Sequence, residues 1–211
     1  MKGEAKFIGI TSGCGGVGTS SLALVLGRSL SRFFNKKVLF LSFDLLASKS
    51  PAVGGASRKD FFNYYQKIIS DSEGSESNLS DFIVSDEYGL DYLKSDSGIN
   101  VLYTGFENLE RVLINSDLVY DVVILDVPSS QLKGLTMLPV CENIIMNYGI
   151  AKAYQYKYCD EYAEFLKLLC PDSVINKFIA HEDPESFIDG ELDIHGEFGS
   201  EVRTLAQKLG F

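Results

Sequence analysis

Residues 6–21 of this chain read KFIGITSGCGGVGTSS, and this stretch decides the fold. The apolar run Lys6–Thr11 is typical of a buried strand, and the segment from Ser20 to Phe34 is typical of a helix. Apolar residues recur in that segment at helical spacing, and Asn35 followed by two lysines suits the end of a helix. The quoted stretch therefore predicts a strand, a glycine-rich turn and a helix in direct succession.

The turn between these two elements is unusually rich in glycine. Glycine lets the backbone curl with its N–H groups pointing inward, and the helix start adds further N–H groups and the positive end of its dipole, so the turn can bind an anion without a charged side chain. The spacing of Gly13, Gly18 and Ser20 fits a phosphate-binding loop in which Ser20 offers its hydroxyl to Mg²⁺. The alternative is a tight turn without a ligand. The candidate nucleotide-binding residues are Gly13, Gly15, Gly16, Val17, Gly18, Thr19, Ser20 and Ser21.

Outward from this motif, short apolar runs alternate with longer amphipathic segments. The alternation is typical of βαβ units, so we expect an α/β fold: a single-domain P-loop NTPase with a mostly parallel sheet flanked by helices. The 211 residues suffice for one domain with a substantial core, and we assign residues 1–211 to it. A further helix is expected after Ser57. The predicted strands are Lys6–Thr11, Val38–Phe43, Asn100–Tyr103, Asp121–Asp126, Asn143–Tyr148 and Ser173–Ile179.

Charge and composition limit the classes of partner. The formal net charge of −10 disfavours broad contact with nucleic acid or anionic lipid, so direct nucleic-acid binding is not expected. A single nucleotide is still compatible, because backbone N–H groups and a metal ion neutralise it locally. The sequence lacks signal-peptide features and an apolar run long enough to span a bilayer. Its four cysteines show no CxxC pair, which is typical of reduced thiols in the cytoplasm.

The glycine-rich turn has a specific resemblance. The stretch TSGCGGVGTSS resembles the deviant Walker A motif of the MinD/ParA family, which usually reads TSGKGGVGKTT, with Cys14 and Thr19 in place of the two lysines. The resemblance implies bound ATP and Mg²⁺, and a homodimer in which the lysine matching Cys14 reaches across to the second nucleotide. Cys14 cannot do so. ATP hydrolysis is therefore expected to be slow or absent, unless Arg58, Lys59 or a partner supplies a cation.

Other segments resemble the same family in the same order along the chain. LFLSFD is similar to the second strand, whose final acid positions the attacking water, and this implies a catalytic role for Asp44. VVILDVP is similar to the Walker B segment, which implies that Asp126 acts with Ser20 at the Mg²⁺ site, through water. INVLYTG is similar to the strand before it. VINK is similar to a late strand whose asparagine, here Asn176, faces the adenine.

Loss of the loop lysine is most similar to the CpaE/TadZ branch, which is associated with placing pilus-assembly machinery at a cell pole. That branch usually carries an N-terminal receiver-like domain, so either the sequence is part of a longer chain or the branch is another one. The implied function is a cytoplasmic, ATP-dependent dimerising switch in polar localisation or partitioning, recruited to a pole or membrane by an unknown pilus-assembly or polarity factor. Two alternatives stay open: an interaction module that binds no nucleotide, and an ATP-dependent metabolic enzyme of the same fold.

Two further features each allow two interpretations. Cys14 lies beside helix N–H groups, so it is either a redox-active thiol or a small apolar residue that fills the place of a lysine. The segment Phe198–Phe211 predicts an amphipathic helix. Because Arg203 and Lys208 are its only cations, packing against the sheet is favoured over membrane binding.

Overall fold

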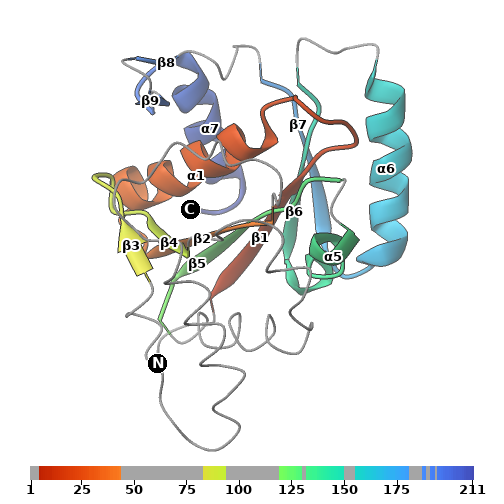
Figure 1. Ribbon diagram of the computed structural model, residues 1–211, viewed down its shortest axis with the longest axis horizontal. Helices are drawn as coiled ribbons and strands as arrows, with labels where there is room; N and C mark the ends of the chain where they lie inside the picture. The colour runs from red at the N-terminus through yellow and green to blue at the C-terminus, as the bar shows by residue number, and fades with distance from the viewer. Residues whose placement is uncertain are drawn as a thin grey trace, which may run out of the picture.

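The computed structural model describes residues 5–43, 83–93, 119–129, 132–149, 155–180, 187–188, 191–192 and 194–211. Its centre is a seven-stranded sheet in the order β3-β4-β2-β5-β1-β6-β7 (Figure 1). Six of these strands run parallel, and the edge strand β3 runs antiparallel to β4. The described elements are β1 Lys6–Thr11, α1 Thr19–Phe34, β2 Val38–Ser42, β3 Ile83–Ser85, β4 Asp91–Leu93, β5 Val122–Asp126, α5 Leu132–Leu135, the 3₁₀ turn η2 Leu138–Val140, β6 Asn143–Asn147, α6 Tyr156–Leu169, β7 Val174–Phe178, β8 Phe187–Ile188, β9 Glu191–Leu192 and α7 Glu197–Lys208.

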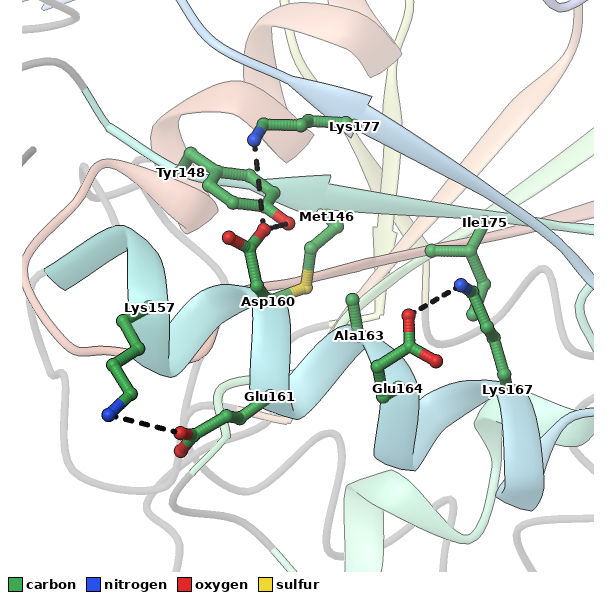
Figure 2. Close-up of a pocket in the computed structure, with 10 residues that line it drawn as sticks. All are labelled: Met146, Tyr148, Lys157, Asp160, Glu161, Ala163, Glu164, Lys167, Ile175 and Lys177. Atoms are coloured by element: carbon green, nitrogen blue, oxygen red, sulfur yellow. Dashed lines mark hydrogen bonds and ion pairs between the residues drawn. The ribbon is translucent and has the colours of Figure 1, made fainter.

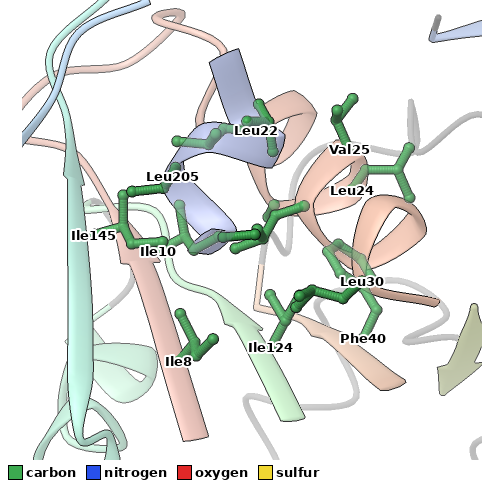
Figure 3. Close-up of a cluster of buried hydrophobic side chains, with 14 of the residues drawn as sticks. Ile8, Ile10, Leu22, Leu24, Val25, Leu30, Phe40, Ile124, Ile145 and Leu205 are labelled. Atoms are coloured by element: carbon green, nitrogen blue, oxygen red, sulfur yellow. The ribbon is translucent and has the colours of Figure 1, made fainter. Parts of the chain in front are cut away.

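Helices cover both faces of the sheet. Helices α1 and α7 lie together on one face, and α6 lies on the other (Figure 1). Strand β1 is buried on both sides because successive side chains alternate: Ile8 and Ile10 pack under α1 and α7, whereas Gly9 faces Leu138 and Cys141. The core beneath α1 and α7 includes Leu22, Leu24, Val25, Leu30, Phe40, Ile124, Ile145 and Leu205 (Figure 3).

Both predicted helices within the described residues are confirmed. Helix α1 begins at Thr19 and ends where Asn35 takes a left-handed conformation with a φ of 51°, its N–H bonded to the Leu30 carbonyl. Helix α7 buries Val202 and Ala206 completely in the same core as α1. The apolar face of the C-terminal helix is therefore used inside the fold, as its few cations predicted.

The strand predictions are also confirmed wherever the structure describes the chain. Lys6–Thr11 matches β1 at both ends, and the four other predicted strands within the described residues are shorter by one residue at one or both ends. The predicted strand Asn100–Tyr103 and the helix after Ser57 lie outside the described residues. In the part of the chain that the structure describes, no helix is both long enough and apolar enough to cross a bilayer.

The β3–β4 hairpin was not predicted, and it is held by a buried acid. Oδ1 of Asp86 accepts the backbone N–H groups of Tyr88 and Leu90 at 2.9 and 3.0 Å. Oδ2 accepts the Tyr92 hydroxyl at 2.7 Å and Nε of Arg28 at 2.8 Å. The Arg28 and Asp86 side chains are only 8% and 7% exposed, so this ion pair fastens the hairpin to α1. The hairpin in turn places β4 parallel to β2.

We expect Asp86→Ala to lower the free energy of unfolding by about 3–5 kcal/mol, because it leaves the Arg28 guanidinium buried without its carboxylate. Urea denaturation followed by circular dichroism measures the loss. The control is Glu164→Ala, which removes the exposed Lys167–Glu164 pair and should cost no more than about 1 kcal/mol. Equal losses in the two variants would contradict the structural role of Asp86.

Candidate functional site

The glycine-rich loop lies at the carboxyl edge of the parallel sheet, between the end of β1 and the start of α1. Ile10 of β1 is in register with Asp126, the last residue of β5, and Ser42 at the end of β2 is in register with the same aspartate. The loop, Asp126 and Ser42 are therefore neighbours at one edge. Ligands of open α/β sheets bind at this edge, because the helices that follow the strands begin there.

The loop backbone takes conformations that glycine permits. Gly16 and Gly18 have φ angles of 68° and 79°. The Gly18 carbonyl then accepts the Leu22 N–H at 2.8 Å, the first hydrogen bond of α1. Gly15, Gly16 and Ser20 are exposed, and a Cβ built on Gly15 meets nothing within 4 Å. The outer side of the loop is therefore open to an anion at the positive end of α1.

The end of β6 supports the loop from one side. Nδ2 of the buried Asn147 donates to the Val17 carbonyl at 2.9 Å. Gly149 follows with a φ of 64°, and a Cβ at this position would lie 2.6 Å from Cβ of Val17. Val17 is thus held by a hydrogen bond to its backbone and by close packing around its side chain.

Helix α6 supports the loop from a second side. A Cβ on Gly13 would lie 2.7 Å from Cα of Cys159 and 2.9 Å from the Tyr158 carbonyl oxygen, so the two backbones touch. One residue before the loop begins, Oγ1 of the buried Thr11 lies 3.2 Å from the Tyr162 hydroxyl. The loop therefore packs on α6 at a point where only glycine fits.

The side chain of Cys14 turns toward the core. It is partly exposed and packs against the core cluster under α6, with its Sγ 3.8 Å from Sγ of Cys159. Ser12 fixes its backbone, because the Ser12 hydroxyl donates to the Cys14 carbonyl at 2.6 Å and accepts the Cys14 N–H at 3.1 Å. The side chain at this position is thus part of the packing between the loop and α6.

One side of the site is formed by the acid Asp126 and by Ser42, which is hydrogen-bonded to it. Asp126 is fully buried at the end of β5, and its Oδ2 accepts the Ser42 hydroxyl at 3.0 Å. The donor types present, the Ser20 hydroxyl and the Asp126 carboxylate, are oxygens that suit Mg²⁺. Within the described residues, no group of three or more His, Cys, Asp or Glu side chains is placed to hold a metal. Mg²⁺ would therefore need nucleotide oxygens and water to complete its coordination.

The other predicted site residues lie elsewhere or outside the description. Asn176 is on β7, where its Nδ2 donates to Oδ1 of Asn143 at 3.1 Å and to the Val174 carbonyl at 3.2 Å. Its contact with an adenine stays a prediction. Asp44 follows the last described residue of the first range, and Arg58 and Lys59 also lie outside the described residues.

Sequence reasoning missed the residues that support the loop: Asn147, Gly149, Cys159 and Tyr162. Each lies at least 130 residues from its contact in the loop or at the residue before it. A glycine after a strand was the one local signal available, because Gly149 directly follows the predicted strand Asn143–Tyr148. Nothing in the sequence tied that glycine to Val17.

A separate groove of about 700 Å³ lies between α6 and strands β6 and β7 (Figure 2). Asp160 accepts the Tyr148 hydroxyl at 2.7 Å and lies 3.7 Å from Nζ of Lys177, which sits over the Tyr148 ring. Burial and the Asp160 carboxylate both raise the pKa of Tyr148, so its hydroxyl stays protonated as the donor. The charges that line this groove are paired with one another, and we assign it no role.

No protein-family model and no curated protein matches the sequence. Solved structures do resemble it in fold. A ParA family ATPase from Chlorobium tepidum superposes with a TM-score of 0.65 at 16% identity, covering 95% of this chain and 81% of that chain. A proposed plasmid partition protein from Borrelia burgdorferi, bound to AMPPNP, gives 0.62 at 18% identity over 98% and 100% of the two chains.

Cobyrinic acid a,c-diamide synthase from Mycobacterium smegmatis, with bound ADP and magnesium, gives a TM-score of 0.62 at 16% identity, covering 97% of this chain and 82% of that chain. The chain therefore has the α/β fold of ParA/MinD-like P-loop NTPases, as the sequence predicted. These neighbours include both ATPases and a biosynthetic enzyme, so the fold does not by itself choose a function.

We expect Gly149→Ala to lower the free energy of unfolding by about 2–4 kcal/mol, since the new methyl group adds a clash with Val17 to the cost of a positive φ. The matched control is Gly89→Ala, which has a φ of 80° but nothing within 4 Å of the added Cβ. It should cost only about 1–2 kcal/mol. Urea denaturation measures both, and a Gly149 variant as stable as the control would refute the packing described for Val17.

Proposed function

We propose that this chain is an ATP- and Mg²⁺-binding protein with a degenerate phosphate loop, whose nucleotide-bound form dimerises and acts as a switch in spatial organisation. The observation that carries the proposal is the state of the loop. Its glycine backbone keeps an exposed outer side next to Asp126, whereas its two lysine positions hold Thr19 and an inward-turned Cys14. The loop thus keeps the groups that bind a phosphate and lacks those that add positive charge.

Binding without the lysines rests on the backbone. A hydrogen bond to a charged group contributes roughly 1.5–3 kcal/mol, so a lost lysine contact weakens triphosphate binding by roughly ten- to a hundredfold or more. The N–H groups of the loop and the start of α1 remain, and they stabilise an anion without side-chain charge. The Ser20 hydroxyl and the Asp126 carboxylate would hold Mg²⁺, which neutralises phosphate charge when bound.

Hydrolysis is affected more than binding. Phosphoryl transfer depends on positioning and on stabilising the charge of the transition state, and the family lysines matching Cys14 and Thr19 supply that charge. Asp44, proposed to orient the attacking water, cannot replace a cation. We therefore infer slow or absent turnover, which suits a protein whose nucleotide-bound state is its active state.

Proteins with a similar fold support the role in spatial organisation. Partition proteins and a ParA family ATPase are among the similar structures, and the loss of the loop lysine resembles the CpaE/TadZ branch. A cytoplasmic dimer that recruits a pilus-assembly or polarity factor fits these likenesses. Two alternatives are an interaction module that binds no nucleotide and a metabolic enzyme, and the diamide synthase neighbour favours testing the second.

Calorimetry with ATP and with ADP, with and without Mg²⁺, tests the proposal, and light scattering on the same samples reports the oligomeric state. We expect ATP to bind in the micromolar range only with Mg²⁺ and to produce or strengthen a dimer. Ser20→Ala should weaken Mg²⁺-dependent binding at least tenfold, since the hydroxyl ligand is lost. Ser200→Ala, on the exposed surface of α7, is the control. If the protein does not bind ATP at millimolar concentration, the proposal fails and the alternative of an interaction module that binds no nucleotide remains.

The missing lysine is tested by restoring it. Thr19→Lys should strengthen ATP binding roughly tenfold or more, because a charged donor again faces the phosphates. Thr19→Gln adds a neutral side chain of moderate length and should leave the affinity within about threefold. Calorimetry compares the three proteins. If glutamine strengthens binding as much as lysine, charge at this position is not what the loop lacks.

A further inference from the structure

Two cysteine thiols face each other where the loop contacts α6. Sγ of Cys14 and Sγ of Cys159 lie 3.8 Å apart, and neither residue is in a disulfide. A disulfide needs a sulfur separation of about 2.05 Å, so an approach of roughly 1.8 Å would join them. The bare Gly13 backbone rests on the backbone of Cys159, which keeps the two chain segments close. We propose that Cys14 and Cys159 form a reversible disulfide when a peroxide oxidises the protein, and that this bond fixes the phosphate loop to α6.

The two thiols differ in the way that such a reaction requires. Cys14 is partly exposed, whereas Cys159 has no exposed surface. Burial raises the pKa of Cys159 to about 11, although the Gly13 N–H favours its thiolate. The Cys159 thiol is therefore protonated at neutral pH and shielded from solvent. A peroxide in solution reaches Cys14 first. The partly exposed residue is the site of attack, and the buried one is the resolving thiol.

The reaction balances with the two thiols and hydrogen peroxide as its only reactants. The Cys14 sulfur attacks one oxygen of hydrogen peroxide, the O–O bond breaks, and water leaves once a proton is taken up, giving a sulfenic acid at Cys14. The Cys159 sulfur then attacks the Cys14 sulfur, the S–O bond breaks, and a second water leaves with the Cys159 proton. Two thiols and one peroxide thus give one disulfide and two waters. A dithiol reductant reverses the change.

The other cysteines provide internal controls. Cys141 and Cys170 are 2% and 1% exposed in the same core cluster as Cys159. Burial raises the pKa of both thiols, and neither lies in the loop. Neither thiol shares the partial exposure to solvent that lets an oxidant reach Cys14. Oxidation at low peroxide should therefore be confined to the pair at the loop.

The bond would change the loop itself. Cys14 lies between Gly13 and Gly15, so drawing its sulfur toward α6 shifts the backbone of the glycine-rich loop. On the proposed nucleotide-binding function, the oxidised protein should bind ATP at least tenfold more weakly than the reduced protein. The geometry of the thiol pair does not depend on that function, so the two claims are tested separately.

The test treats the reduced full chain with stoichiometric hydrogen peroxide, blocks the remaining thiols with an alkylating agent under denaturing conditions, and maps the cysteines by mass spectrometry. We expect the titratable thiols to fall from four to two and the Cys14 and Cys159 peptides to be joined. Cys170→Ser should form the same link. Cys14→Ser and Cys159→Ser should not. A wild-type protein that keeps four thiols, joins another pair, or oxidises Cys14 beyond the sulfenic acid without a link overturns the proposal.

Calorimetry with ATP and Mg²⁺ on the mapped samples then separates the two claims. A linked protein that binds ATP tenfold more weakly than the reduced one, with recovery on adding dithiothreitol, supports both. A linked protein whose reduced form binds no ATP supports the disulfide and overturns the proposed nucleotide function. A linked protein with unchanged ATP affinity overturns the effect assigned to the bond.

Discussion

The candidate site depends on a backbone contact that only glycine allows. Gly13 rests directly on the backbone of α6, and Gly149 lets the end of β6 close on Val17. A Cβ at Gly13 would lie 2.7 Å from Cα of Cys159, and one at Gly149 would lie 2.6 Å from Cβ of Val17, so either would force the neighbouring atoms apart. The loop is thus shaped by packing on both sides, and its exposed residues, Gly15 and Gly16, lie on the side away from that packing. A ligand is not needed to explain this shape, although the shape suits one.

Electrostatics then decides what such a loop can do alone. The chain carries a net charge of −10, which repels a nucleotide at long range. The stretch from Thr11 to Ser21 contains no Lys or Arg that would oppose this repulsion. What remains attractive acts at short range: backbone N–H groups and the positive end of α1, whose influence extends over about one helical turn. On the proposed function a divalent cation is therefore central to binding, and the carboxylate that would hold it, Asp126, is in register with Ile10 near the end of β1.

The sequence predicted the local features and missed the long-range ones. The run Lys6–Thr11 and the end of α1 at Asn35 follow from apolar periodicity and chain-terminating residues, which are encoded locally. The β3–β4 hairpin was missed because its strands have three residues each, too few to show a period, and because its organiser, Asp86, works through contact with Arg28. The supports of the loop were missed for the same reason. Loop composition predicts a phosphate-binding turn, but only the fold shows what the turn packs against.

The cysteine at position 14 has two consequences for the loop. A lysine there would need to leave the loop and enter solvent, because the space behind it is occupied by the core under α6. Cysteine is small and apolar enough to pack against that core, so its side chain adds contact between the loop and α6 and brings no positive charge. The loop is therefore anchored on α6 and has no cation at this position, which on the proposed function makes it less able to assist phosphoryl transfer. A loop with those properties is suited to holding a nucleotide in one state, and a thiol at that contact gives the same anchor a means of being tightened by oxidation.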